Sequence, residues 1–287
     1  MTPSAPSVLL AGLVFPECPR WHQGKLWFSD MGGRHVLTVD AEGRSEVKAS
    51  VERPAGLGFL PDGRLLMVSA TDPFLRRLDP DGLHALADVS SLGSVVLNDM
   101  VVDKEGRAYI GDDAFDMAAG TRPRPGRLIL VTPDGSARVV AEDLSFPNGI
   151  VITPDGKTLI VAETIGRRLT AFDVAADGSL TGRRLFADVG VSGVGGLMPD
   201  GICLDAEGAI WVASVATGEF VRVVEGGAVT QRIPVPGKWA VACMLGGQDR
   251  RTLFLCTART TPTDLAQGTS AGWIETVHVD VPGAGLP

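Results

Sequence analysis

The chain has 287 residues, of which 45% are hydrophobic, with 36 glycines, 19 prolines and a formal net charge of −8. The composition suits a globular protein with many short strands and turns. The acidic balance argues against nucleic acid or an anionic membrane surface as partner, because both require a basic face. The start of the chain does not resemble a signal peptide, and no apolar run approaches the roughly 18 residues needed to span a bilayer. We therefore expect a cytoplasmic protein.

A repeated pattern runs along the chain: a polar residue, an alternating apolar run, an Asp/Glu-Gly turn and a second apolar run. Clear copies begin at Asn98, Asn148 and Asp200, spaced 50 and 52 residues apart. Shorter matches begin at Glu17 and Ala55, and a sixth copy begins at Ala242. Units of this length hold about four short strands, and units that cannot bury their own sheets must stack into a ring. The sequence therefore predicts an all-β fold, a six-bladed β-propeller of four-stranded antiparallel blades, as a single domain over residues 1–287.

The first five blades are expected in chain order, over residues 17–50, 55–89, 98–141, 148–189 and 200–234. The sixth begins at Ala242 but has sequence for three strands only, ending with residues 273–279. A missing fourth strand would leave an open sheet edge. The apolar run at residues 7–13 can fill that place, so we expect the N-terminal strand to pair in the last blade and close the ring.

Strand direction decides which connections share a face of the propeller. The starts of the six copies fall on one face, the top, together with two long connections at residues 113–126 and 258–272. Long connections without structure in a compact domain are usually functional, so these two could form a lid. The Asp/Glu-Gly turns fall on the opposite, bottom face and are interpreted as ordinary turns.

The residues that begin the copies would form one ring at the top of the central channel. That ring comprises Glu17, Ala55, Asn98, Asn148, Asp200 and Ala242. The two carboxylates would repel each other unless a cation lay between them. Carboxylate and amide oxygens suit a hard divalent ion, Ca²⁺ first, with Mg²⁺, Mn²⁺ or Zn²⁺ as alternatives. The competing interpretation is a set of capping residues that hydrogen-bond neighbouring backbone.

A second ring is predicted at the ends of the second strands. Its members are Asp30, Ser69, Asp112, Glu163 and Ser214. Such groups could orient metal ligands and waters from behind. Plain solvation at the strand ends is the alternative, and the sequence leaves both open.

Other candidate nucleophiles and ligands are less well placed. Residues 268–272 match G-x-S-x-G, but no helix follows them, as a nucleophile elbow requires. The cysteines are dispersed and are expected to be buried free thiols: Cys18, Cys203, Cys243 and Cys256. The histidines show no spacing typical of a metal site: His22, His35, His84 and His278.

Five short stretches together resemble a known family. They are residues 17–21 (ECPRW), 98–107 (NDMVVDKEGR), 146–150 (FPNGI), 199–205 (PDGICLD) and 246–253 (GGQDRRTL). The chain resembles the SMP-30/gluconolactonase/luciferin-regenerating-enzyme family over nearly its whole length. The resemblance implies a six-bladed propeller that hydrolyses lactones with one divalent metal. It also implies Glu17, Asn148 and Asp200 as metal ligands and Asn98 as a substrate contact.

The chain departs from the sugar-lactone members of that family at two positions. Val96 stands where those members have an arginine, two residues before Asn98, and Trp239 stands where a smaller polar residue is more usual. With Phe115 and Met117 they would form an apolar wall, which favours a less polar lactone. In the implied mechanism Asp200 accepts a proton from the attacking water, and Asn98 donates a hydrogen bond to the carbonyl or ring oxygen.

Two other function classes remain open from the sequence. Propellers often bind a ligand or a protein without catalysing a reaction, because a fold does not determine a function. A metal-free condensation of the strictosidine-synthase type is a second alternative. The ring of oxygen donors speaks against it.

Overall fold

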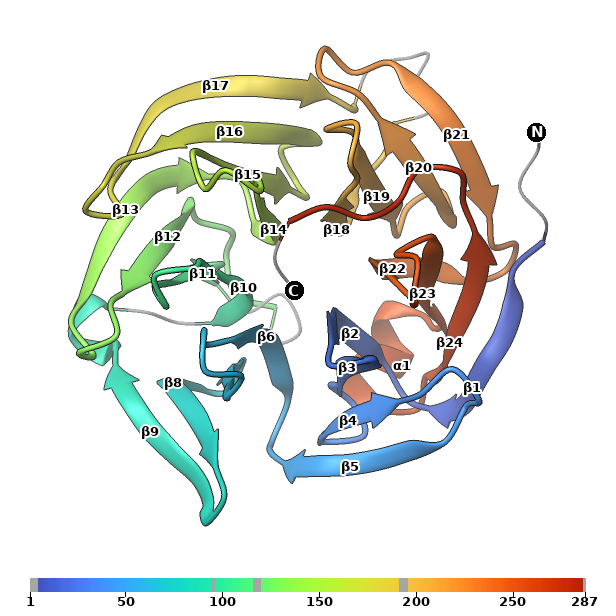
Figure 1. Ribbon diagram of the computed structural model, residues 1–287, viewed down its shortest axis with the longest axis horizontal. Helices are drawn as coiled ribbons and strands as arrows, with labels where there is room; N and C mark the ends of the chain where they lie inside the picture. The colour runs from blue at the N-terminus through green and yellow to red at the C-terminus, as the bar shows by residue number, and fades with distance from the viewer. Residues whose placement is uncertain (1–4, 94–95, 116–119, 191–195, 286–287) are drawn as a thin grey trace.

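The computed structural model describes residues 5–93, 96–115, 120–190 and 196–285. Six four-stranded antiparallel sheets surround a central axis (Figure 1), so the predicted six-bladed β-propeller is confirmed. Each blade places its first strand beside the axis and its last strand at the rim. In the described part of the chain no helix is long and apolar enough to cross a membrane.

The strands of the first three blades are as follows. Blade 1 contains β2 (Pro16–His22), β3 (Lys25–Asp30), β4 (His35–Val39) and β5 (Ser45–Ser50). Blade 2 contains β6 (Pro54–Phe59), β7 (Leu65–Ser69), β8 (Asp72–Asp79) and β9 (Gly82–Asp88), followed by a 3₁₀ turn, η1 (Ser90–Leu92). Blade 3 contains β10 (Leu97–Val102), β11 (Ala108–Asp112), β12 (Gly126–Val131) and β13 (Ala137–Leu144).

The remaining blades complete the circle. Blade 4 contains β14 (Pro147–Ile152), β15 (Thr158–Glu163), β16 (Arg168–Val174) and β17 (Leu180–Asp188). Blade 5 contains β18 (Pro199–Leu204), β19 (Ile210–Ser214), β20 (Glu219–Val223) and β21 (Val229–Pro234). Blade 6 contains β22 (Trp239–Gly246), β23 (Thr252–Arg259), β24 (Ala271–His278) and β1 (Ser7–Leu13).

The N-terminal strand closes the propeller as predicted. β1 pairs antiparallel with β24, from Ser7 opposite Thr276 to Leu13 opposite Gly272. Leu13 at the end of β1 is buried and joins the apolar core that blade 6 shares with its neighbours. The outer edge of β24 is therefore paired with β1, and the last blade has four strands like the others.

The inner strands of neighbouring blades pack closely because several of them have a glycine as their third residue. A Cβ at Gly149 would lie 2.5 Å from the backbone nitrogen of Ile202, and a Cβ at Gly201 would lie 2.4 Å from the Cβ of Ala242. Any larger side chain would push β14, β18 and β22 apart. The glycines of the Asn-Gly and Asp-Gly pairs in the repeats are thus required by close contact between neighbouring blades.

One expected loop contains a helix. The connection between β23 and β24 was predicted to be unstructured, but it forms α1 (Pro262–Gln267), whose N-terminus is closed by a reciprocal capping box between Thr261 and Asp264. Gly268 ends the helix with a left-handed φ of 67°. The connection between β23 and β24 is therefore partly helical and not an irregular loop throughout.

Candidate metal centre

The expected ring forms at the start of the inner strands. Glu17, Asn98, Asn148 and Asp200 are each the second residue of their strand, on β2, β10, β14 and β18. Proline is the first residue of β2, β14 and β18, where its missing N–H costs no ladder hydrogen bond. The pairing register then shifts within the first few residues of all six inner strands. Such bulges redirect side chains beside functional sites.

The sixth member of the ring differs from the expectation by one residue. Pro147 pairs with Glu163 and Ile150 with Val161 in blade 4, while Ala240 pairs with Thr257 and Cys243 with Leu255 in blade 6. The two registers make Val241 the counterpart of Asn148, where the repeat alignment had placed Ala242. The bulge has the same size in both blades, and the extra residue of blade 6 lies in the turn: six residues separate the paired Ile152 and Leu159, whereas seven separate the paired Leu245 and Leu253. Blade 6 contributes an apolar side chain either way.

The three expected metal ligands are all buried. Their exposed fractions are 8% for Glu17, 7% for Asn148 and 6% for Asp200. The pKa of Asp200 is raised to about 8, chiefly by burial and also by the Asp99 carboxylate, while a hydrogen bond from the Asn148 side chain acts in the opposite direction. Burial also raises the pKa of Glu17 well above its usual 4.5, reinforced by the Asp200 and Asp99 carboxylates. The site thus holds carboxylates that protein groups alone leave poorly stabilised in their charged form.

A buried ion pair lies directly below the ring and was not expected from the sequence. The Nη2 of Arg20 on β2 donates to the Oδ1 of Asp99 on β10 at 2.6 Å, and also to the Met100 carbonyl. Both side chains are about 5% exposed. The pair joins two inner strands that are separated by β6. The signal was available, because a charged residue inside a strand predicted to be buried needs a partner.

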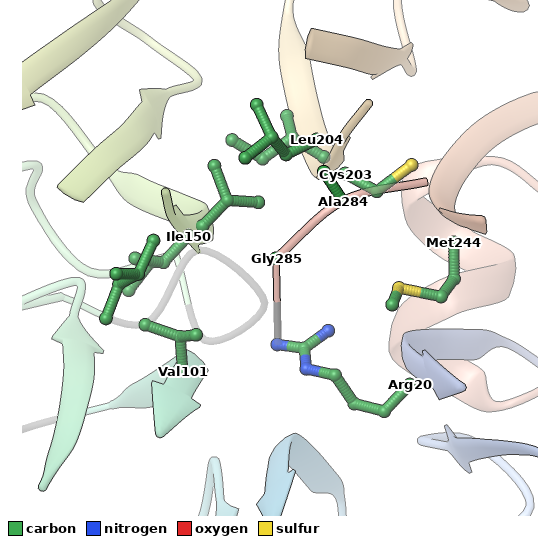
Figure 2. Close-up of a pocket in the computed structure, with 11 residues that line it drawn as sticks. Arg20, Val101, Ile150, Cys203, Leu204, Met244, Ala284 and Gly285 are labelled. Carbon is green, nitrogen blue, oxygen red and sulfur yellow. The ribbon is translucent and has the colours of Figure 1, made fainter. Parts of the chain in front are cut away.

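Below this ion pair lies a small cavity of about 20 Å³, roughly the space of one water molecule. Figure 2 shows Arg20 reaching across it toward Gly285, with Val101, Ile150 and Met244 around it. Gly285 lies at the edge of this cavity (Figure 2), and the chain just before it is held by a hydrogen bond from the Ala284 nitrogen to the Leu204 carbonyl at 3.0 Å.

Asn98 is held by two neighbours that only accept hydrogen bonds. Its Nδ2 donates to the Asp113 carboxylate at 3.1 Å and to the Pro147 carbonyl at 3.5 Å. Asp113 is buried and follows the last residue of β11. The family resemblance implied that Asn98 donates a hydrogen bond to the substrate. Instead its donor group faces the protein, and its oxygen is the group left for a ligand.

The second ring has a different role from either of those considered. Its members bind the incoming connections of the top face, just before the ring residues. Asp30 accepts from the Phe15 nitrogen at 2.7 Å, Asp112 from the Val96 nitrogen at 3.4 Å and Glu163 from the Ser145 nitrogen at 2.7 Å. Ser214 accepts from the Met198 nitrogen at 3.2 Å, and Ser69 donates to the Glu52 carbonyl at 2.7 Å. We call these five residues the latch ring.

Glu163 shows how completely the latch ring is satisfied. It accepts from Arg168 at 2.7 Å and from the Thr170 hydroxyl at 2.5 Å, in addition to Ser145. Although burial opposes ionisation, these bonds lower the pKa of Glu163 from its usual 4.5. Glu163 therefore fixes the backbone just before Asn148, one of the expected metal ligands, and its own charge is compensated by Arg168.

The expected apolar wall is described for three of its four residues. Val96 and Phe115 are 8% and 3% exposed, and Phe115 packs on Phe146 with ring centroids 5.4 Å apart. Trp239 begins β22 and is half-buried. The strands β10 and β22 lie on opposite sides of the axis (Figure 1), so Val96 and Trp239 do not form one continuous surface. Met117 lies outside the described residues.

The sulfur and serine candidates take structural positions. All four cysteines are buried and free, as expected, and the Sγ atoms of Cys203 and Cys243 lie 3.7 Å apart. Burial raises the pKa of the Cys18 thiol well above its usual 9.0, so it stays protonated beside Glu17. Ser270 follows helix α1 and precedes β24, the reverse of a nucleophile elbow, and its Oγ lies 2.6 Å from that of Thr260.

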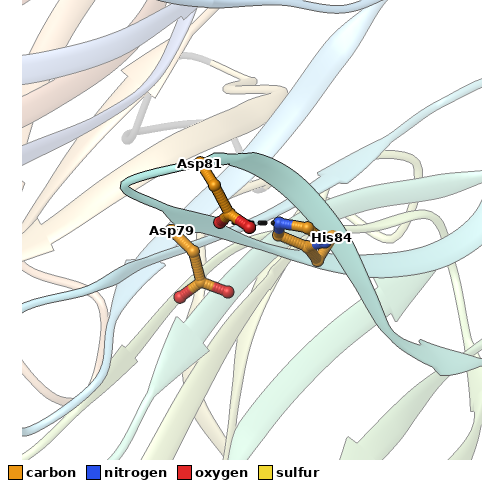
Figure 3. A group of neighbouring side chains, drawn as sticks. All are labelled: Asp79, Asp81 and His84. Carbon is orange, nitrogen blue, oxygen red and sulfur yellow. Dashed lines mark hydrogen bonds and ion pairs between the residues drawn. The ribbon is translucent and has the colours of Figure 1, made fainter.

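A further acidic group lies away from the ring. The ligand atoms of Asp79, Asp81 and His84 lie within 4.8 Å of one another on the β8–β9 hairpin (Figure 3), a proximity that the sequence spacing did not reveal. His84 contacts Asp81 at 2.9 Å, and Asp79 is already engaged by Arg77 at 2.7 Å and by Arg64 at 3.2 Å. We interpret the group as a hydrogen-bonded hairpin network, because the Asp79 carboxylate already has two arginine partners.

The chain is similar in sequence and in fold to proteins of one known family. Residues 15–259 match the model of the SMP-30/gluconolactonase/LRE-like region. The chain is 27% identical to the 6-deoxy-6-sulfogluconolactonase of Pseudomonas putida, over 96% of this chain and 94% of the relative. The crystal structure of a calcium-binding regucalcin from Agrobacterium tumefaciens is 26% identical, with a TM-score of 0.81 over 100% of this chain and 97% of the other.

A luciferin-regenerating enzyme is similar in fold, with a TM-score of 0.84 at 19% identity over 98% of this chain and 99% of the other. The family match covers most of the chain, including all six inner strands and the latch ring. The chain therefore belongs to the SMP-30/gluconolactonase/LRE-like family.

Proposed function

We propose that this protein is a lactone hydrolase that depends on one divalent metal ion held by Glu17, Asn148 and Asp200. The observation that carries the proposal is the charge balance at the top of the axis. Glu17, Asp99 and Asp200 influence one another electrostatically, and Arg20 is the cation paired with Asp99. When all three carboxylates are ionised, these four groups leave two negative charges uncompensated in a buried site. A divalent cation supplies the missing charge.

The donor set fits a hard cation. Two carboxylates and one carboxamide offer oxygen ligands, and the neighbouring Cys18 thiol is kept protonated by burial. Oxygen ligands of this kind favour Ca²⁺, with Mg²⁺, Mn²⁺ or Zn²⁺ as weaker candidates. The calcium-binding regucalcin named above supports the same choice.

The chemistry follows from what each residue can do. A bound divalent ion polarises a lactone carbonyl and lowers the pKa of water, effects worth several kcal/mol in ester hydrolysis. Asp200 accepts the proton of the attacking water, since a ligand carboxylate retains an oxygen for this task. The latch ring keeps the ligand-bearing backbone fixed, so that little reorganisation is needed during the reaction. Ring opening then yields the hydroxy acid.

The substrate is proposed to be a lactone less polar than a sugar lactone. The Pseudomonas putida relative supports lactone chemistry. Val96 supplies a buried apolar side chain beside Asn98, and Phe115 and the half-buried Trp239 add aromatic surface elsewhere on the top face. Apolar walls of this kind discriminate by shape, at about 1–3 kcal/mol per methylene.

Metal removal tests the proposal directly. The protein is purified without added metal, its metal content is measured, and a lactone panel is assayed before and after EDTA treatment. We expect hydrolysis to disappear with EDTA and to return on addition of Ca²⁺. Hydrolysis that persists in metal-free protein, or a panel that shows no turnover with any of the four ions, would contradict the assignment.

A further inference from the structure

The orientation of the Asn98 amide is determined by its surroundings. Its Nδ2 faces the two oxygens of Asp113, at 3.1 and 3.3 Å, and the carbonyl of Pro147, at 3.5 Å. An ionised carboxylate and a peptide carbonyl accept hydrogen bonds and cannot donate them. Rotating the amide by 180° would place its oxygen against these acceptors. The amide therefore has one stable orientation.

This orientation leaves the amide oxygen for a ligand. Asn98 is half-buried, and within the described residues its Oδ1 receives no hydrogen bond. It lies in the same ring as the three proposed metal ligands, on the blade next to that of Asn148. The group presented beside a bound lactone is thus a hydrogen-bond acceptor, which pairs with a hydroxyl and not with a carbonyl oxygen.

Asp113 is itself held in place by the end of β11. Its backbone nitrogen donates to the Val96 carbonyl at 3.0 Å. The preceding Asp112 accepts from the Val96 and Ala114 nitrogens, at 3.4 and 3.0 Å. The side chain that orients Asn98 thus belongs to a closed loop of hydrogen bonds that includes Val96.

In blade 4 the residue that corresponds to Asp113 makes a different hydrogen bond. Thr164 follows the last residue of β15, as Asp113 follows the last residue of β11. Its hydroxyl donates straight to the Pro199 carbonyl at 2.7 Å, just before Asp200. In blade 3 the equivalent Pro147 carbonyl is reached through Asn98. The carboxylate at position 113 therefore adds a constraint that blade 4 does without.

We propose that Asp113 is a positioning residue that fixes the acceptor of Asn98 toward the substrate, so that the site prefers lactones with a hydroxyl group beside the reacting carbonyl. The inference rests on the proposed lactone hydrolysis and specifies its substrate class. It is compatible with an otherwise apolar lactone, because a single hydroxyl satisfies Asn98.

A pair of lactones that differ by one hydroxyl tests the kinetic consequence. With Ca²⁺ saturating, kcat/KM is measured for α-hydroxy-γ-butyrolactone and for γ-butyrolactone. One hydrogen bond in a half-buried position corresponds to about a fivefold to tenfold preference for the hydroxylated lactone. The Asp113→Leu variant should bring the ratio close to one, and the shape-matched Asp113→Asn variant should lower it at least about threefold, since its amide can also pair with a rotated Asn98. The Asp134→Asn variant, at an exposed bottom turn of the same blade, is the matched control and keeps the wild-type ratio.

A binding measurement separates this inference from the hydrolysis itself. Ligand-detected NMR gives the affinities of 2-hydroxycyclopentanone and cyclopentanone, two ketones that differ by the same hydroxyl group as the two lactones but have no ester bond. We expect tighter binding of the hydroxylated ketone to the wild type and a loss of that difference in Asp113→Asn, with the melting temperature and the stabilisation by Ca²⁺ unchanged. This result stands even if no lactone is hydrolysed, in which case the proposed function fails alone.

Two outcomes overturn the inference. The first is equal affinity of the wild type for the two ketones, including no detectable binding of either. The second is an Asp113→Asn variant that melts at a lower temperature yet keeps the wild-type ratios in both measurements, which would make Asp113 a structural residue only.

Discussion

Glu17 and Glu163 are both buried glutamates near the top of neighbouring strand layers, yet their pKa values shift in opposite directions. Burial and nearby carboxylates raise the pKa of Glu17, whereas the bonds from Arg168, Thr170 and Ser145 lower that of Glu163. Glu17 accepts a hydrogen bond of 3.3 Å from its neighbour Cys18, and Glu163 is surrounded by donors at 2.5 to 2.8 Å. The same residue type is left short of compensation in one ring and fully compensated in the other.

This difference indicates which ring awaits a ligand. A folded protein rarely leaves buried carboxylates without partners, because the cost is several kcal/mol per group. Where such groups face one another across an axis, an external cation is the simplest compensation. Where they bind backbone nitrogens of the next connection, they stabilise the fold and need nothing further.

The largest effect is expected from removing a ligand of the inner ring. Asp200→Ala or Glu17→Ala should reduce lactone hydrolysis by at least about a thousandfold, because an oxygen ligand of the proposed ion is lost while no core volume is removed. Circular dichroism should still show a folded propeller. Turnover retained in either variant at saturating metal would remove these residues from the site.

A shape-preserving change at the same position sharpens the comparison. Asp200→Asn removes one buried charge, so the metal-free variant should melt a few degrees higher than the metal-free wild type, while Ca²⁺ should no longer stabilise it. A metal-free variant that is less stable than the wild type would mean that Asp200 is already compensated by protein groups.

Removing the closing strand should affect both rings at once. Deleting residues 1–13 exposes the edge of β24 and removes Leu13 from the core, at a cost of about 3 kcal/mol or more. Asp30 binds the Val14 and Phe15 nitrogens just after β1, so the latch of blade 1 should loosen as well. An unchanged melting temperature in the truncated protein would show that the propeller closes by other contacts.

The repeats carried most of the fold. The repeated strand pattern gave the number of blades, the closing strand and the positions of Glu17, Asn98, Asn148 and Asp200, because each of these repeats begins its inner strand at the same level of the axis. The sixth position was wrong by one residue, since the turn between β22 and β23 is one residue longer than the turn between β14 and β15.

What the repeats could not give are side-chain contacts between strands. Arg20 pairs with Asp99 across two blades, and Asp113 fixes Asn98 from the end of the next strand. Such pairs depend on side-chain reach and on the angle between blades, neither of which appears in a spacing. The helix α1 was missed because its six residues are too few to show an apolar period.

A moderate effect is expected in the latch ring. Glu163→Gln keeps the shape but weakens the bonds to Ser145, Thr170 and Arg168, and it should lower the free energy of unfolding by about 2 kcal/mol. The lowered pKa means that the wild type gains this stability above about pH 4.5 and loses it as the pH falls through the lower folded value. Urea unfolding at about pH 7 and about pH 3 measures both terms, and the gap between variant and wild type should narrow at the acidic pH.

The matched control is Glu142→Gln, on the exposed strand β13. It should change stability by less than about 0.5 kcal/mol at either pH. If Glu163→Gln removes hydrolysis as completely as Asp200→Ala does while remaining folded, the role of Glu163 is not limited to stabilising the fold.

The smallest effect concerns substrate choice at Val96. This residue is buried beside the latch residue Asp112 and two positions before Asn98. An arginine there would bring a guanidinium with several donors, which a valine cannot replace in binding hydroxyl groups. We expect the wild type to have a higher kcat/KM on dihydrocoumarin than on glucono-δ-lactone, and Val96→Arg to move the ratio toward the sugar lactone by about 1–3 kcal/mol. Val96→Leu is the control for altered volume and should leave the ratio within about threefold. A wild-type preference for glucono-δ-lactone at equal metal loading would show that the apolar side chain at this position does not determine specificity, since the remaining polar groups of the ring would then be sufficient to recognise a polyol.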